Sequence, residues 1–294
     1  MHAAEIRIDL AQATLTAKTW GDPTLPPLLA LHGWLDNAGS FDRLAPLLGG
    51  DRHVVALDLL GHGHSSHLPA GAWYHYIDYF DQIRATLDYF GWQRADLLGH
   101  SLGGTLASLF AALYPERVGE LLLIEALGPL TNTPDDTLPQ LRRALDQRAA
   151  FMDKRPLRVF PTQASAIAAR VAANDLSEAA ARAIVERGVN AVEGGFVWSS
   201  DPRLTLASPQ RYTEAQVLAM LVGIRAPTLL VLADPATRYL PTATMDARAT
   251  ALANIRVVRL PGHHHLHLDE PQAVAETIRA FARAVETGES LATW

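Results

Sequence analysis

The sequence predicts an α/β protein with a mostly parallel central sheet, helices on both faces and an inserted helical cap. Short apolar runs alternate with amphipathic stretches, a pattern typical of buried parallel strands joined by covering helices. Of the 294 residues, 49% are hydrophobic and 19% are charged, so the chain can bury a large core. The alternation stops between about residues 129 and 221, where helical patterns follow one another without a buried parallel strand.

The expected strands fall into two groups, one before and one after this helical stretch. They are 6–10 and 14–20, which form an N-terminal hairpin, then 28–31, 54–57, 95–98, 121–124, 228–232 and 255–260. Helices are expected at 74–90, 102–114 and 271–285, and within the helical stretch at 138–152, 163–173 and 177–189.

An insertion of roughly 90 residues is too long for an ordinary connection between core elements. We therefore expect a core built from residues 1–127 and 223–294, interrupted by a helical cap at 128–222. The chain enters and leaves the insertion at the same edge of the core. This arrangement favours a cap over the ends of the core strands and disfavours a separate interaction domain.

Composition excludes several classes of function. The balance of 25 basic and 31 acidic residues gives a net charge of −6, and no basic run predicts nucleic-acid or membrane binding. The absence of cysteine excludes a thiol nucleophile, cysteine-ligated zinc and disulfides. The N-terminus lacks the apolar run of a signal peptide. We expect a cytoplasmic protein, either a monomer or a homodimer.

A candidate nucleophile lies between the strand at 95–98 and the helix that follows it. The sequence Gly-His-Ser-Leu-Gly-Gly spans Gly99 to Gly104 and has the pattern of a nucleophile elbow. A strand that turns sharply into a helix needs neighbours without bulk, which Gly99 and Gly103 provide. Ser101 is the predicted nucleophile, and the backbone N–H of Leu102 is a predicted oxyanion donor. A phosphate-binding loop is not favoured, because no Gly-Lys-Ser/Thr follows.

A second oxyanion donor is expected in the loop after the strand at 28–31. We assign it to the backbone N–H of Trp34, since Gly33 lets the chain approach the site closely. Trp34 and His100 are the predicted substrate-binding side chains. Packing of the Trp34 indole beneath the cap is an equally supported interpretation.

The general base is expected after the last strand, where His263, His264, His265 and His267 follow one another. Four histidines in five positions suggest a metal site. However, neighbouring ligands on one loop cannot all converge on one ion, and no separate Asp/His cluster completes the coordination. One histidine near Ser101 is sufficient for acyl transfer. We therefore expect neither a metal nor a cofactor.

Together these motifs resemble the α/β-hydrolase superfamily. The ordered set comprises 32–34, 58–65, 99–104 and 261–271, which spans nearly the whole chain. In that family the catalytic histidine stands seven residues before the proline that opens the last helix, which implies His264 from Pro271. The closer resemblance is to the serine hydrolase-like subgroup. It is carried by Leu31 to Asp42, Glu186-Arg187-Gly188 and Asp201-Pro202-Arg203-Leu204.

The catalytic acid is where the sequence departs from the family's usual pattern. The resemblance places it just after the strand at 228–232, but Ala236 occupies that position and Asp234 comes two residues early. The haloalkane dehalogenases take their acid from the end of the preceding core strand, where this chain has Glu125. A carboxylate that ends an apolar run is costly to leave unpaired. We favour Glu125, with Asp234 as the alternative acid and a structural Glu125 bonded to the cap as a third interpretation.

These residues predict a serine hydrolase that cleaves a carboxylic ester or related acyl bond of a small molecule through an acyl-Ser101 intermediate. Serine at the elbow disfavours a dehalogenase or an epoxide hydrolase, which need aspartate there. The same residues suit a C–C bond hydrolase, a lactonase, an amidase or a cofactor-free perhydrolase. The irregular turn at 233–236 leaves open a non-catalytic binding protein on a hydrolase scaffold.

Overall fold

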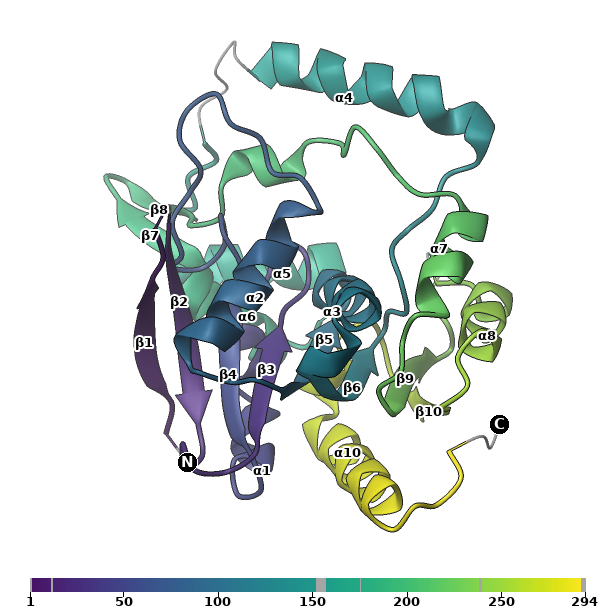
Figure 1. Cartoon of the computed structure of the whole chain (residues 1–294). Helices are drawn as coiled ribbons and strands as arrows, with labels where there is room; N and C mark the ends of the chain where they lie inside the picture. Colours follow the sequence, from purple (N-terminus) through teal and green to yellow (C-terminus); the bar gives the residue numbers. More distant parts are fainter. Residues whose placement is uncertain (1, 12, 152–156, 175, 238–239, 292–294) are drawn as a thin grey trace.

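A computed structural model describes residues 2–11, 13–151, 157–174, 176–237 and 240–291. Its centre is an eight-stranded sheet with the order β1-β2-β4-β3-β5-β6-β9-β10 (Figure 1). The strands are β1 (Ala4–Asp9), β2 (Thr14–Trp20), β3 (Pro27–Leu31), β4 (His53–Asp58), β5 (Ala95–His100), β6 (Val118–Ile124), β9 (Thr228–Asp234) and β10 (Ile255–Pro261). β2 pairs antiparallel with β1 and β4, and the other pairs are parallel. The predicted fold class is confirmed.

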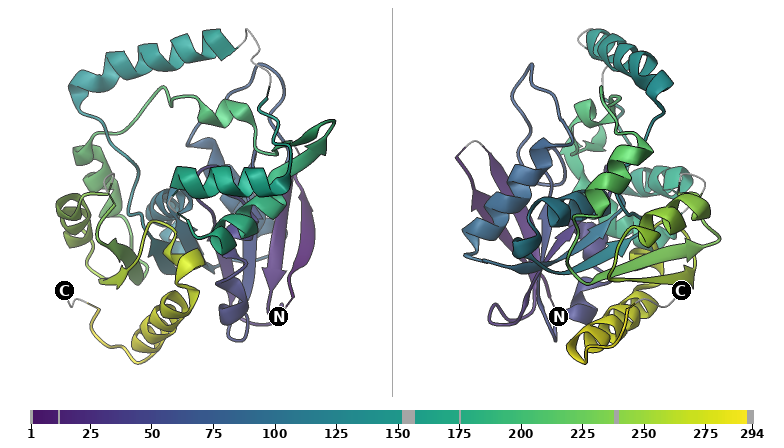
Figure 2. Two further views of the ribbon diagram at one scale, coloured as in Figure 1. Left: turned by 180° about the vertical axis from the view of Figure 1, so that it is seen from behind. Right: turned by 45° about the vertical axis from the view of Figure 1, so that its right-hand side comes forward.

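Helices cover both faces of the sheet, because its central strands are apolar on both sides. Leu29 and Leu31 of β3 pack into one buried cluster, whereas Leu28 and Ala30 pack into a second cluster on the opposite face. The first face is covered by α2 (Asp78–Tyr89), α3 (Leu102–Leu113), α7 (Glu214–Leu221) and α8 (Thr242–Thr250). The second is covered by α1 (Ala45–Leu48) and α10 (Pro271–Glu286), and turning the molecule by 180° brings α10 forward (Figure 2).

The segment between β6 and β9 holds several helices, of which α7 packs on the sheet. In chain order it holds α4 (Thr137–Phe151), α5 (Gln163–Asn174), α6 (Glu178–Gly188), the hairpin β7 (Val189–Val192) and β8 (Gly195–Trp198), and α7. We call residues 128–222 the inserted segment. α5 and α6 pack together around Ile167 and Ile184, and Leu268 from the core completes this cluster. α4 lies apart, above the other elements in Figure 1.

The structure contains elements that the sequence analysis did not predict. The hairpin β7–β8 follows directly on α6 and turns at Gly194 and Gly195, which both have positive φ. α7 begins with a capping box between Thr213 and Gln216. Both features carry local sequence signals, a Gly-Gly turn and a Thr-x-x-Gln cap. α8 does not, because threonine occurs three times in its nine residues and is a weak helix former.

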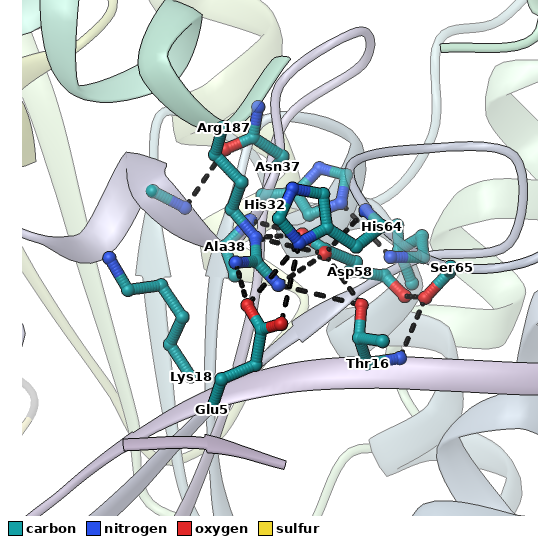
Figure 3. A network of polar contacts seen from close by, with 12 residues as sticks. Glu5, Thr16, Lys18, His32, Asn37, Ala38, Asp58, His64, Ser65 and Arg187 are labelled. Atoms are coloured by element: carbon teal, nitrogen blue, oxygen red, sulfur yellow. Dashed lines mark hydrogen bonds and ion pairs between the residues drawn. The ribbon is translucent and has the colours of Figure 1, made fainter. Parts of the chain in front are cut away.

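A buried ion pair fastens the inserted segment to the core (Figure 3). Arg187, in the last turn of α6, donates from Nε and Nη2 to Asp58 Oδ2 over 2.9 and 2.7 Å. Asp58 ends β4 and is fully buried, and the guanidinium also pairs with Glu5 of β1. One side chain of the inserted segment thus reaches two strands of the sheet.

Asp58 also organises the core around it. Its carboxylate accepts hydrogen bonds from the backbone N–H groups of Ala38 at 2.7 Å and His64 at 2.9 Å, and from Thr16 Oγ1 at 2.8 Å. Burial alone would raise the pKa of the Asp58 carboxyl, but Arg187 and these donors bring it below its ordinary value. The charge on Asp58 therefore depends on Arg187.

Replacing Arg187 with methionine should lower the free energy of unfolding by about 3–5 kcal/mol, because it leaves the Asp58 carboxylate buried and unpaired. Arg182→Met on the same helix is the matched control. Arg182 pairs with Glu178 on the surface, and such a pair contributes at most about 1 kcal/mol. Urea unfolding of both variants measures the difference, and equal losses would contradict the anchoring role of Arg187.

Candidate active site

Ser101 lies at the turn from β5 into α3 in a strained backbone conformation. Its φ is 49° and its ψ is −115°. A residue with a side chain held in such a region costs on the order of 1–3 kcal/mol. The Ser101 N–H donates to the carbonyl of Ile124 at 3.1 Å, and its own carbonyl accepts from Thr105 N at 3.0 Å. The neighbouring strand and the first turn of α3 therefore hold the strained turn in place.

The glycines beside Ser101 are required by close backbone contacts. A Cβ atom on Gly99 would lie 2.5 Å from the carbonyl oxygen of Gly103. A Cβ atom on Gly103 would lie 1.9 Å from the carbonyl oxygen of Leu31. Neither position can hold a side chain without moving the backbone, which is the steric requirement of a nucleophile elbow.

The two predicted oxyanion donors come from neighbouring segments, the first turn of α3 and the loop after β3. Leu102 is the first residue of α3, where backbone N–H groups have no acceptor within the helix. Trp34 follows β3, which pairs with β5 so that Leu31 lies opposite Gly99. The N–H of Gly103 donates to the carbonyl of His32 at 3.0 Å and joins α3 directly to the loop after β3.

The Trp34 side chain lies at the boundary between the core and the inserted segment. Its indole Nε1 donates to the carbonyl of Leu204 at 2.9 Å, yet 52% of the residue is exposed. The indole thus packs against the inserted segment and also presents an apolar surface to solvent. The bond to Leu204 agrees with the packing interpretation made from the sequence, and contact with substrate stays a prediction.

His264 and Glu125 form a hydrogen-bonded pair. Nδ1 of His264 lies 3.1 Å from Oε2 of Glu125, which follows β6 and is only 2% exposed. Glu125 also accepts from Ala233 N at 2.6 Å and from Thr237 Oγ1 at 3.3 Å, so core residues hold its carboxylate. A carboxylate can only accept, so Nδ1 of the imidazole carries the proton and Nε2 of the neutral ring is left as the acceptor.

Asp234, the alternative acid, is placed differently. It ends β9 opposite Pro261 of β10 and is exposed to solvent. Its backbone carbonyl accepts from Gly262 N at 3.2 Å, whereas the carboxylate bonded to His264 belongs to Glu125. Of the two carboxylates considered from the sequence, the structure brings Glu125 to the imidazole.

His100 does not lie where a substrate contact was expected. Its side chain is completely buried, and its Nε2 donates to the backbone carbonyl of His264 at 2.8 Å. The imidazole therefore lies behind the loop that carries His264, and an expected direct contact with substrate does not fit this position.

The sequence analysis overlooked Asp36. This buried residue lies beside His100 and His265, and one nitrogen or oxygen atom from each of the three lies within 4.8 Å of the others. The argument that no acid from elsewhere meets the loop histidines was therefore wrong. Asp36 stands four residues after His32 in the first family motif, and that position was the available signal.

Comparisons with known proteins show the family to which this chain belongs. A protein-family model described as alpha/beta hydrolase fold matches residues 26–271. A serine hydrolase-like protein of Danio rerio is 33% identical over 287 residues, which cover 95% of this chain and 88% of that protein. A crystal structure of a hypothetical protein from Pseudomonas aeruginosa PAO1 superposes with a TM-score of 0.89 at 40% identity and covers 95% of this chain and 99% of that one.

A thioesterase domain from the curacin biosynthetic pathway superposes with a TM-score of 0.83 at 28% identity and covers 95% of this chain and all of that one. The chain belongs to the α/β-hydrolase fold family, and within that superfamily it is a serine hydrolase. Both resemblances inferred from the motifs are confirmed. Among the residues that the structure describes, no helix is both long and apolar enough to cross a bilayer.

Substituting alanine for Gly103 should destabilise the elbow, because the new Cβ overlaps the Leu31 carbonyl, which is backbone and cannot rotate away. The expected loss is about 1–3 kcal/mol in the free energy of unfolding, the usual cost of overpacking. Gly50→Ala serves as the control, since a Cβ there meets nothing within 4 Å. Urea unfolding compares the two, and a Gly103→Ala variant as stable as Gly50→Ala would contradict the steric argument.

Proposed function

We propose that this protein hydrolyses a carboxylic ester or a related acyl bond of a small molecule through an acyl-Ser101 intermediate. One observation carries the proposal, the 3.1 Å contact between His264 Nδ1 and Glu125 Oε2. A buried carboxylate that orients an imidazole, on the fold whose strand–helix turn presents a serine, is the arrangement that serine acyl-transfer enzymes use.

In this mechanism each group has one role. Glu125 keeps the proton on Nδ1 of His264, so that Nε2 accepts the proton of the Ser101 hydroxyl during attack on the carbonyl carbon. The backbone N–H groups of Leu102 and Trp34 donate to the oxyanion that forms. The imidazolium then gives its proton to the leaving group. Water attacks the acyl-enzyme in the second half of the reaction, again with His264 as base.

We further propose that residues 128–222 act as a cap, on a core made of 1–127 and 223–294. Two contacts support this role. The Trp34 indole bonds to Leu204 in the inserted segment, and Arg187 ties α6 to the core. The inserted segment also exposes Leu138 and Leu145 on α4, which are 75% and 52% exposed. Exposed apolar side chains of this kind suit contact with an acyl chain.

The thioesterase domain gives independent support for an acyl bond as the target. Its name describes cleavage of a thioester, and a thioester is attacked at its carbonyl carbon as an ester is. Oxygen esters and thioesters are therefore the first two substrate classes to compare.

Ser101→Ala should lower kcat for short p-nitrophenyl esters by about 10⁶-fold, because it removes the nucleophile. Ser290→Ala is the control, since Ser290 is exposed near the end of the described chain. A fluorophosphonate probe should label the wild-type and control proteins but not Ser101→Ala. Undiminished turnover by Ser101→Ala would refute the nucleophile assignment.

Glu125→Gln should lower kcat by about 10⁴-fold, because the carboxylate no longer holds His264 in the tautomer whose Nε2 accepts the serine proton. Asp234→Asn should leave kcat nearly unchanged, since Asp234 is exposed and the imidazole is bonded to Glu125. Steady-state kinetics with p-nitrophenyl butyrate measures both variants. A larger loss in Asp234→Asn than in Glu125→Gln would reverse the assignment of the acid.

A further inference from the structure

A second group of polar side chains lies behind the loop that carries His264. Asp36 comes from the loop after β3, His100 ends β5, and His265 follows β10. All three are buried. Asp36 Oδ2 lies 3.4 Å from His265 Nε2 and 3.6 Å from His100 Nδ1. Three segments that are distant in sequence thus bring two imidazole nitrogens to one carboxylate oxygen.

The protons on His100 leave an electron pair facing this oxygen. Its Nε2 lies 2.8 Å from the carbonyl of His264, and a carbonyl only accepts, so Nε2 carries hydrogen. In a neutral imidazole one nitrogen donates and the other accepts, so a ring that donates from Nε2 keeps the lone pair on Nδ1. Among the described residues Nδ1 has no hydrogen-bond partner. A buried acceptor that faces a carboxylate is costly unless a cation or a donor lies between them.

We propose that Asp36 Oδ2, His100 Nδ1 and His265 Nε2 form a binding site for a divalent transition-metal ion such as zinc. Two histidines and one carboxylate are an established zinc ligand set, which leaves a fourth position for water. Ligand atoms about 2.1 Å from an ion at tetrahedral angles lie roughly 3.4 Å apart. The contacts of 3.4 and 3.6 Å to Asp36 Oδ2 match this spacing, and the three ligand atoms all lie within 4.8 Å of one another.

The surroundings of the three ligands have the features of a metal site. A metal-bound histidine usually donates its other N–H to a carbonyl or carboxylate, as His100 Nε2 does to His264. His267 lies nearby but is not a ligand in this assignment, since its Nε2 lies 2.8 Å from the Ser40 hydroxyl.

Arg170 of α5 pairs with the other oxygen of Asp36, Oδ1. The ion and the guanidinium therefore share one carboxylate, each on its own oxygen. Because both are cations, Arg170 weakens the binding of the ion, and its removal should strengthen that binding.

An ion at this position joins the two loops that carry the proposed catalytic groups. His100 directly precedes Ser101, and His265 directly follows His264. The ion lies behind these residues and takes no part in bond making. Its effect is to hold the elbow and the histidine loop at a set separation, and the ion-binding site exists whether or not Ser101 forms an acyl-enzyme.

Titration of the full-length, chelator-treated protein with Co²⁺ tests the site without any assay of hydrolysis. We expect one equivalent to bind and to give the intense visible absorption of a four- or five-coordinate nitrogen and oxygen site, and Zn²⁺ should displace it. Elemental analysis after gel filtration should find one zinc per chain. A featureless Co²⁺ spectrum together with zinc well below one equivalent overturns the proposal.

Three variants locate the bound ion. His265→Asn should weaken Zn²⁺ binding by more than the roughly 10–100-fold loss that is typical when a residue bonded to a ligand, and not to the ion, is replaced. Arg170→Gln should tighten it, which a network held only by hydrogen bonds does not predict. His263→Ala, an exposed neighbour on the same loop, is the matched control and should bind as wild type does. Wild-type Zn²⁺ affinity in a His265→Asn protein with native circular dichroism overturns the site. If His265→Asn fails to fold, the Zn²⁺ affinity of Arg170→Gln tests the site in its place, and an affinity no tighter than that of the wild type overturns it.

Discussion

The strained turn at Ser101 is the constraint around which the rest of the site is arranged. The turn is possible only because the backbone of α3 approaches the ends of β3 and β5 without intervening side chains. This approach puts the loop after β3, which carries Trp34, directly beside the first turn of α3, where Gly103 N bonds to the His32 carbonyl. The strained turn thus lies where α3, β5 and the loop after β3 meet.

The position of the acid follows from the sheet. β6 and β9 are neighbours with β6 next to β5, so both strands end near the elbow and either could supply a carboxylate to the last loop. Asp234 extends β9 into solvent, whereas Glu125 turns inward with a positive φ of 54°. An inward carboxylate needs donors, and Ala233, Thr237 and His264 supply them. The burial that makes Glu125 costly is also what keeps it aimed at the imidazole.

Charged groups also determine how the inserted segment sits on the core. Arg187 and Arg170 both reach from its helices to buried carboxylates, Asp58 at the end of β4 and Asp36 in the loop after β3. Each carboxylate stands in or next to a loop of the site, since Asp58 binds Ala38 N and Asp36 follows Trp34 closely. Buried ion pairs tolerate little displacement, so docking of α5 and α6 and the shape of the loop after β3 depend on each other.

The sequence by itself determined the strands of the core, the covering helices α2, α3 and α10, and the serine of the elbow, whereas the family resemblance implied His264. The strands, the helices and the elbow depend on short-range physics: apolar periodicity, glycine where a turn excludes Cβ, and a proline that opens a helix. Local signals for β7–β8 and α7 were also present, as a Gly-Gly turn and a capping box, but were not used. Only the tertiary structure decided which carboxylate meets His264, that His100 faces inward, and that Asp36 joins two histidines. These outcomes depend on how segments far apart in the sequence meet in space, and no local pattern of residues specifies such a meeting.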